Sequence, residues 1–249
     1  MPRFFVDEYL PLSPLPSSIR LTGDDAFHLV RVLRARAGEK VVVVGGDGTE
    51  FVCRFDAAEE SGAGVAAILS VESASKPDDR GVAVTLLQGM PKGKKTDLVL
   101  QKATELGADV IALVYMERSV PAPDRDDGKK IERFQRIVRE AAEQSGRTTV
   151  PEVRLYRSLK DALPLLMESE IAFACYEAEE ERTLPEILRQ SGASIAFLVG
   201  PEGGLSRREI DVLQSARVPT VTLGRRILRT ETAPLAVLSM ILYEKELSS

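Results

Sequence analysis

The chain of 249 residues contains only two cysteines, Cys53 and Cys175, and one histidine, His28. Two cysteines so far apart in the sequence exclude a disulfide framework and favour a cytoplasmic protein. These residues do not have the spacing of zinc ligands, so we expect no metal site built from cysteine and histidine. A site made only of carboxylates stays open.

Long apolar runs are also missing. No stretch approaches the roughly 20 apolar residues that a membrane-spanning helix needs. The opening residues, MPRFFVDEYLPLSPLP, show neither the charged nor the apolar region of a signal peptide. The net charge of −5 argues against nonspecific binding of nucleic acid over the whole surface. We therefore expect a cytoplasmic protein that does not associate with membranes.

The first part of the chain has the pattern of a small β-rich domain. In EKVVVVGGDGTEFVCRFD two strand-like runs flank GGDG, a strong hairpin signal because glycine and aspartate adopt positive φ. RFFV and AGVAAILSVES predict further strands, and DDAFHLVRVLR has the apolar spacing of one helix. Short strands around one helix predict a small β-barrel over residues 1–72, and the polar segment SASKPDDRG is a linker near residues 72–81.

The rest of the chain, residues 73–249, alternates between apolar strands and amphipathic helices. The predicted strands are 82–88, 109–115, 151–156, 171–176, 194–199 and 220–223, and a helical pattern follows each. Uniformly apolar strands in such βα units predict an α/β fold with a mostly parallel sheet covered on both faces. Ligands bind at the carboxyl ends of strands in such sheets, so the βα loops are the place to look for a site.

The first unusual βα loop is GPEGG, from Gly200 to Gly204. Ser206 and Glu209 form the S-x-x-E pattern of a capping box, so the next helix should begin at Ser206. Glycines permit close approach of a ligand to the backbone, but they also serve turns that need positive φ. The loop alone leaves both interpretations open.

The second unusual loop is GRRILRTETA, which follows the last predicted strand. Thr232 is a good N-cap, with Pro234 in the first helical turn. The loop then has about eight residues, more than the usual two to six of βα connections. Arginines interleaved with an Ile-Leu pair favour a binding loop over a solvated surface loop.

A phosphate-binding loop is an alternative for QGMPKGKKTD. The P-loop pattern requires four residues between its glycines and a serine or threonine after its lysine. Here three residues separate Gly89 from Gly93, and Lys95 stands where the hydroxyl residue should be. A nucleotide-binding enzyme therefore stays only a minor alternative.

Four motifs occur in order along the chain: QKATELG, REAAEQSGR, LVGPEGGLSRREI and LGRRILRTETAPLAVL. They resemble those of the small-subunit ribosomal RNA methyltransferases that methylate N3 of a uridine, members of the SPOUT superfamily. FHLVRVLRARAGEKVVVVGGDG resembles the PUA-like RNA-binding domain of the same family. The resemblance covers almost the whole chain, and it implies a C-terminal SPOUT-type domain that contains a trefoil knot.

The resemblance also implies a cofactor and partners. The enzyme would methylate a uridine of 16S ribosomal RNA, naked or in the assembled small subunit, using S-adenosylmethionine, and it would act as a homodimer. The implied cofactor-binding residues are Tyr176, Leu198, Gly200, Pro201, Glu202, Gly203, Leu223, Gly224, Ile227, Leu228 and Thr230. The residues expected to contact RNA are Arg31, Arg34, Lys92, Lys94 and Arg147. An RNA-binding protein without catalysis is the alternative, which the intact loops disfavour.

Methylation at N3 requires a uracil anion, and the sequence offers two ways to obtain it. Arg229 would stabilise the anion electrostatically, close to the uracil carbonyl oxygens. Alternatively, Glu231 or Glu202 would act as a base, which requires burial to raise its pKa towards neutrality. The last helix carries an apolar stripe, Leu235, Leu238, Ile241 and Leu242, which either forms the dimer interface or packs on its own sheet.

Overall fold

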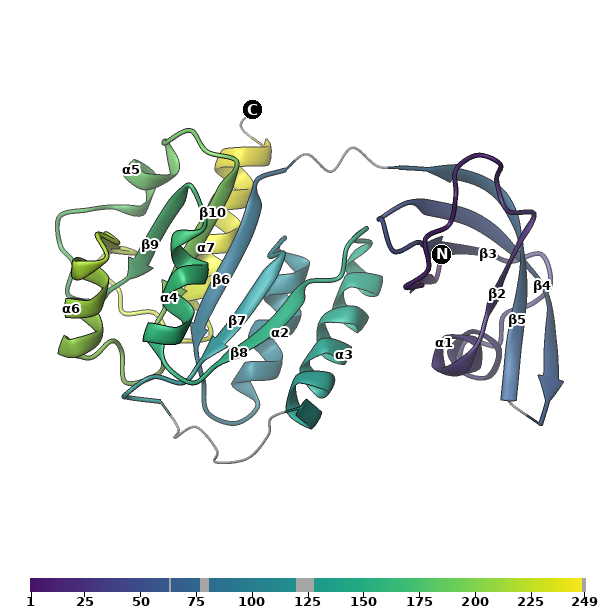
Figure 1. The fold of residues 1–249 in the computed structure, drawn as a ribbon, viewed down its shortest axis with the longest axis horizontal. Coiled ribbons are helices and arrows are strands. Elements are labelled where there is room, and N and C mark those ends of the chain that lie inside the picture. The colour runs from purple at the N-terminus through teal and green to yellow at the C-terminus, as the bar shows by residue number, and fades with distance from the viewer. Residues whose placement is uncertain (63, 77–80, 120–127, 248–249) are drawn as a thin grey trace. The chain divides into compact units, whose positions relative to one another are not determined.

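The computed structural model describes residues 1–62, 64–76, 81–119 and 128–247. The chain divides into two compact units (Figure 1). The N-terminal unit comprises residues 1–79 and 142–149, and the C-terminal unit comprises residues 80–141 and 150–249. Within the described residues, no helix is long and apolar enough to cross a membrane.

The N-terminal unit is built on a curled five-stranded sheet in the order β1-β3-β4-β5-β2 (Figure 1). Its strands are β1 Arg3–Phe5, β2 Ser18–Leu21, β3 Lys40–Val44, β4 Glu50–Ser61 and β5 Gly64–Ser75. The predicted hairpin around GGDG is confirmed, since β3 and β4 pair antiparallel. The sequence analysis missed β2, a run of four residues that is too short to give a clear periodic signal.

The helix predicted over DDAFHLVRVLR is present but irregular. An α-helical turn, α1 Gly23–Phe27, continues directly into a π-helical turn, η1 His28–Val32. Leu29 is completely buried and packs with Phe51 and Leu69 of the sheet. Phe27 and Leu33, two of the apolar residues whose spacing predicted the helix, are 55% and 45% exposed, so the spacing identified neither the buried face nor the change of helix type.

The C-terminal unit contains a six-stranded sheet in the order β11-β9-β10-β6-β7-β8, with parallel pairing throughout. The strands are β6 Ala83–Gly89, β7 Val110–Val114, β8 Glu152–Tyr156, β9 Ile171–Cys175, β10 Ser194–Val199 and β11 Thr220–Val221. The helices are α2 Lys95–Glu105, α3 Gly128–Ser145, α4 Leu159–Met167, α5 Leu184–Leu188, α6 Arg207–Ser215, α7 Ala233–Leu242 and η2 Tyr243–Leu247. The predicted parallel α/β fold is confirmed.

Helices cover both faces of this sheet. Buried residues of α2, α3, α5 and α7 share one apolar cluster with the sheet, and those of α4 and α6 share the other. Successive residues of a strand point to opposite faces of the sheet. Since helices cover both faces, residues on both sides of the strands are buried, which explains why the strands are uniformly apolar.

The apolar stripe of α7 is partly used within the chain itself. Leu238 and Ile241 are only 1% and 3% exposed and pack in the cluster shared with α2, α3 and α5. The interpretation of these two residues as a dimer interface is therefore wrong, because their own sheet covers them.

The chain takes an unusual route after β11. That strand pairs with β9 at the edge of the sheet, yet α7 packs against α2. Residues 222–232 therefore pass across the carboxyl ends of β9 and β10 before α7 begins. The trefoil knot expected from the family resemblance stays a prediction.

Candidate active site

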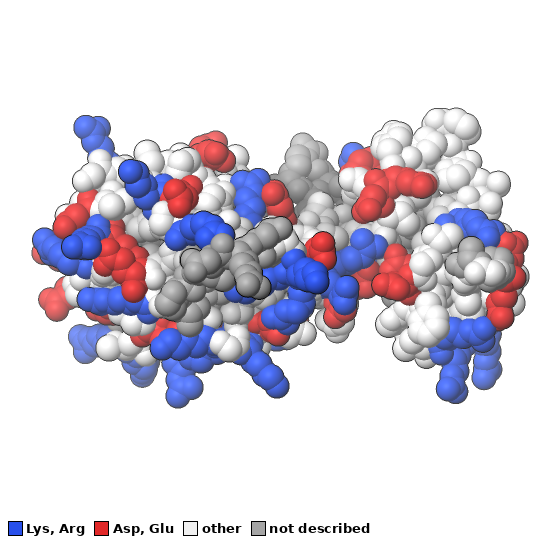
Figure 2. Space-filling model, turned by 60° about the horizontal axis from the view of Figure 1, so that its bottom comes forward, with Lys and Arg blue, Asp and Glu red and all other residues white. Residues whose placement is uncertain are grey.

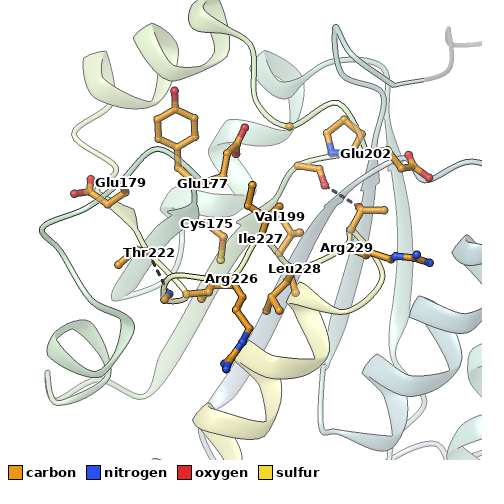
Figure 3. Close-up of a pocket in the computed structure, with 18 of the residues that line it drawn as sticks. Cys175, Glu177, Glu179, Val199, Glu202, Thr222, Arg226, Ile227, Leu228 and Arg229 are labelled. Carbon is orange, nitrogen blue, oxygen red and sulfur yellow. Dashed lines mark hydrogen bonds between the residues drawn. The ribbon is translucent and has the colours of Figure 1, made fainter.

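A cavity of about 850 Å³ lies at the carboxyl ends of β9, β10 and β11. Its wall consists of residues at and after the ends of these strands (Figure 3). Lys95 at the start of α2 and Ala233 at the start of α7 complete it. The lining residues include Cys175, Tyr176, Glu177, Glu179, Glu180, the segment 199–204, the segment 222–230 and Ala233. A cavity of this volume lies within the range of about 300 to 1,000 Å³ that is typical of small-molecule sites.

The GPEGG loop leads into a well-defined helix start. The Glu209 backbone N–H donates to the Ser206 hydroxyl at 3.2 Å, and the Ser206 backbone N–H donates to the Glu209 carboxylate at 2.7 Å. The predicted capping box is therefore confirmed. It fixes the end of the loop that forms one wall of the cavity.

Thr230 connects this loop to the segment after β11. Its hydroxyl donates to the Gly200 carbonyl at 2.8 Å and accepts from the Gln88 side-chain amide at 2.9 Å. Gln88 lies in β6 and is completely buried. One threonine thus joins three parts of the chain at the cavity wall.

Gly203 and Gly224 are required for different structural reasons. A Cβ on Gly203 would lie 2.7 Å from Arg118 Cβ, and Arg118 Nη1 donates to the Gly203 carbonyl at 3.1 Å. Gly203 is therefore required for packing against Arg118, apart from any role towards a ligand. Gly224 has φ of +102°, and the position that a Cβ would take there has no neighbouring atom within 4 Å, so its requirement is conformational.

Lys95 lies between two carboxylates of the site. Its Nζ is 3.1 Å from Glu231 Oε2 and 3.3 Å from Glu202 Oε1. The contact with Glu231, followed by that with Glu202, raises the pKa of Lys95 above its usual value against the opposing effect of desolvation. The Lys92 backbone N–H donates to the same Glu202 oxygen at 3.1 Å.

The two carboxylates are held in the ionised form. Desolvation raises the pKa of Glu202, but backbone N–H groups and Lys95 outweigh it, so the pKa lies below its usual value. The pKa of Glu231 is lowered in the same way, by its own backbone N–H, Lys95 and Arg229 acting against desolvation. The raised pKa that a carboxylate base requires is therefore absent at both residues.

Arg229 is exposed and lines the cavity. Figure 3 shows its side chain directed away from Cys175 and Val199, on the same side as Glu202. Arg229 therefore places a permanent positive charge at the rim of a partly apolar cavity.

Cys175 also lines the cavity, but it is not available as a nucleophile, because burial raises the pKa of its thiol to about 12.

Almost all cofactor residues implied by the family resemblance line this cavity, including Ile227, whose side chain is 85% exposed. Leu198 does not line it, because it is completely buried in the cluster shared with α4 and α6. The sequence analysis missed Glu177, Glu179 and the structural residue Gln88 as parts of the site. The position of Gln88 at the end of a predicted strand was the available signal.

The residues predicted to contact RNA occur in both units. Arg31 forms an ion pair with Glu60, Arg34 has a left-handed φ of 54°, and Arg147 Nη2 donates to Thr149 Oγ1 at 3.3 Å. Lys92 and Lys94 are exposed in the loop before α2. The pairing of Lys95 with two carboxylates argues against a phosphate-binding loop at this position.

Family models match the two parts of the chain. An RNA methyltransferase domain matches residues 78–242, and an RNA methyltransferase PUA domain matches residues 21–63. The ribosomal RNA small subunit methyltransferase E of Bacillus subtilis is 32% identical and the alignment covers 99% of this chain and 98% of that protein. The protein of the same name from Mycobacterium tuberculosis is 34% identical over 88% of this chain and 84% of its own.

Solved structures show the same architecture. The ribosomal RNA small subunit methyltransferase E of Neisseria gonorrhoeae, bound to S-adenosylmethionine, has a TM-score of 0.85 and 33% identity, covering 97% of each chain. A putative methyltransferase of Legionella pneumophila in complex with the same cofactor has a TM-score of 0.83 and 26% identity, covering 96% of each chain. The chain therefore belongs to the ribosomal RNA small subunit methyltransferase E family.

Proposed function

We propose that this protein transfers a methyl group from S-adenosylmethionine to N3 of a uridine in 16S ribosomal RNA. The observation that carries the proposal is the cavity at the carboxyl ends of β9, β10 and β11, bounded by GPEGG and the segment around LRTET. This cavity lies in a member of a family whose relative from Neisseria gonorrhoeae binds S-adenosylmethionine.

The cavity suits this cofactor in size and chemistry. Its volume is about 850 Å³, and Val199, Leu223 and Leu228 give it apolar surface for a flat base. The Glu177 carboxylate suits hydroxyl and ammonium groups of a ligand, whereas the Glu179 carboxylate already accepts from the backbone N–H groups of Glu181 and Arg182 and from the Thr220 hydroxyl. The residues proposed to hold the cofactor are Tyr176, Gly200, Pro201, Glu202, Gly203, Leu223, Gly224, Ile227, Leu228 and Thr230. When bound, S-adenosylmethionine supplies an activated methyl group on a sulfonium centre.

Arg229 is the residue that we propose to stabilise the uracil anion. Its guanidinium is permanently charged, and it reaches the rim of the cavity from the segment after β11. A cation positioned beside the uracil carbonyl oxygens favours loss of the N3 proton and holds the base in place. Glu202 and Glu231 instead keep Lys95 and the loops in position, because both remain ionised.

We propose that residues 1–72 bind the RNA and that residues 73–249 hold the cofactor and add further RNA contacts. The match of residues 21–63 to a PUA domain supports the first assignment. Arg31, Arg34, Lys92, Lys94 and Arg147 would contact phosphates, in naked RNA or in the assembled small subunit. The protein would act as a homodimer in the cytoplasm, with exposed Met240 and Tyr243 near the end of α7 as part of the interface.

The test combines cofactor binding with methyl transfer. Calorimetric titration with S-adenosylmethionine should show binding by the wild type and weaker binding by Ile227→Asp, whose exposed side chain lines the cavity. Met167→Asp, exposed at the far end of α4, is the matched control. Wild-type protein should methylate 16S ribosomal RNA at one uridine N3, located by mass spectrometry. RNA binding without methylation would favour the non-catalytic alternative.

A further inference from the structure

A second hollow, of about 360 Å³, lies in the C-terminal unit. It is found where β7 and β8 end and where α4 and α6 begin. Its lining residues are Tyr115, Met116, Glu117, Arg157, Ser158, Leu159, Lys160, Arg208, Glu209 and Val212. None of these residues belongs to the cofactor cavity.

Cations predominate among the charged groups of this hollow. Arg157, Lys160 and Arg208 line it. Glu209 is only 5% exposed, and its carboxylate accepts from the backbone N–H groups of Ser206 at 2.7 Å and Glu117 at 3.0 Å. The Glu209 carboxylate therefore interacts with backbone N–H groups and not with the cations of the hollow.

The remaining carboxylate, Glu117, compensates Arg208 only weakly. Glu117 Oε1 is 3.8 Å from Arg208 Nη1, and the Arg208 side chain is 86% exposed. Such an exposed pair contributes little and is easily replaced by another anion. Lys160 is also exposed.

Two of these cations occupy positions that are unfavourable for helix stability. Lys160 lies in the first turn of α4, and Arg208 lies in the first turn of α6. The helix dipole favours anions at an N-terminus and disfavours cations there. Each first turn also contains a carboxylate, Asp161 in α4 and Glu209 in α6, but both cations line one hollow, which suits an anionic ligand between them.

The hollow lies on the same edge of the sheet as the cofactor cavity. From β8 to β10 there are three strand spacings, β8-β7-β6-β10, which correspond to about 14 Å at roughly 4.8 Å per spacing. Stacked nucleotides advance by about 3.4 Å each, so the separation corresponds to roughly four nucleotides. Figure 2 shows lysine and arginine side chains gathered along the lower border of the C-terminal unit.

We propose that this hollow binds a backbone phosphate of the substrate RNA, a few nucleotides from the methylated uridine. Lys160 and Arg208 make the phosphate contacts, and the first turn of α4 adds backbone N–H donors. The contact fixes the register of the RNA on the sheet edge without reading its sequence. This inference rests on the proposed function, since it presumes an RNA substrate.

The test measures the salt dependence of RNA binding. Lys160→Gln/Arg208→Gln removes two charges at the hollow, and Lys102→Gln/Arg189→Gln removes two charges near the C-terminal ends of α2 and α5 as a matched control. Binding of a 16S ribosomal RNA transcript is measured by filter retention across a series of salt concentrations. Affinity for S-adenosylmethionine and melting temperature are measured on the same samples.

The hollow variant should bind RNA more weakly than the control variant at low salt. Its slope of log affinity against log salt should be shallower by about 0.7 for each single-strand phosphate that the protein no longer neutralises. Cofactor affinity should stay unchanged, and the melting temperature should be equal or higher because unfavourable charges leave the helix starts.

Two results would overturn the inference, and they are distinguishable from failure of the proposed function. If the wild type methylates the RNA and the hollow variant matches the control in affinity and slope, only the phosphate site is refuted. Weaker binding with an unchanged slope would likewise refute a phosphate contact. If the wild type neither binds nor methylates the RNA, the proposed function fails and the phosphate site fails with it. The single variants Lys160→Gln and Arg208→Gln repeat the measurement should the double variant not fold.

Discussion

The Thr230 hydroxyl donates a hydrogen bond to the Gly200 carbonyl at 2.8 Å, across thirty positions of sequence. The same oxygen accepts from the buried amide of Gln88. These two hydrogen bonds hold the GPEGG loop and the segment after β11 at a fixed separation. The shape of the cavity therefore depends on one hydroxyl group that need not itself touch a ligand.

Replacing Thr230 by valine should weaken cofactor binding and stability together. The change keeps the side-chain volume but leaves the Gln88 amide and the Gly200 carbonyl without this partner, at a cost of about 1 to 3 kcal/mol. Urea unfolding and calorimetric titration with S-adenosylmethionine measure the two effects. Thr230→Ser retains the hydroxyl and should lie close to the wild type. Equal behaviour of valine and serine variants would show that the hydrogen bonds are unimportant.

Gly203→Ala should destabilise the protein even without ligand. The new Cβ would meet Arg118 Cβ at 2.7 Å, and overpacking of this kind costs about 1 to 3 kcal/mol. Arg118→Gly/Gly203→Ala removes the opposing Cβ, so the double variant should lose less than the sum of the two single losses. If the losses in the free energy of unfolding of the two single variants simply add in the double variant, the packing explanation is refuted. Gly203 would then be required only for its role towards the ligand.

Lys95→Met should reduce the acid sensitivity of the fold. The folded-state pKa values of Glu202 and Glu231 lie below the ordinary 4.5, so their ionisation stabilises the protein above about pH 4.5 and is lost as pH falls through the folded values. Without Lys95 both values rise, and the free energy of unfolding should fall less between about pH 6 and pH 3. Lys94→Met, in the same loop, is the control. The prediction is wrong if both variants show the wild-type pH dependence in urea unfolding.

Arg229→Ala should slow methyl transfer at saturating RNA and cofactor by about a hundredfold or more. Its rate should continue to rise with pH beyond the point where the wild type levels off, because bulk deprotonation of uracil replaces the lost stabilisation. Glu231→Gln should have the smaller effect on the rate, since its pKa is lowered. Single-turnover methylation across pH measures both variants. A wild-type rate and pH profile in Arg229→Ala would refute the assignment.

Arg31→Glu/Arg34→Glu should weaken binding of 16S ribosomal RNA and make its salt slope shallower. Replacing Arg31 by glutamate also places two carboxylates side by side, because Arg31 pairs with Glu60. Cofactor affinity should not change, as neither residue lines the cavity. Unchanged RNA affinity in filter binding would identify the two arginines as solvated surface residues.

Local patterns predicted those parts of the molecule that depend on local interactions. The capping box of Ser206 and Glu209 needs only residues three positions apart, so the start of α6 followed directly from the sequence. The parallel sheet followed from the apolar strands, and Gly107, with φ of +93°, follows α2 in the left-handed conformation of a C′ glycine. Thr232 lies at the predicted N-cap of α7, although its side chain makes no capping hydrogen bond.

Long-range interactions were beyond local patterns. Gln88 meets Thr230 across 142 positions, and Arg118 supports Gly203 from a loop after β7. The role of Lys95 depends on two carboxylates supplied by different loops, so the sequence showed it only as a mismatch to the P-loop pattern. The low pKa values of Glu202 and Glu231 likewise follow from partners that only the fold brings together.

The route of residues 222–232 across the ends of β9 and β10 has a consequence for biosynthesis. During translation, strands β1 to β5 are synthesised first. Five of the six strands of the parallel sheet, β6 to β10, are synthesised before β11. The cavity wall, however, requires residues 222–230 and the bonds of Thr230 to Gly200 and Gln88. A chain released before these residues are translated would lack the cavity, and it would also lack α7, whose buried residues belong to the core of the C-terminal unit.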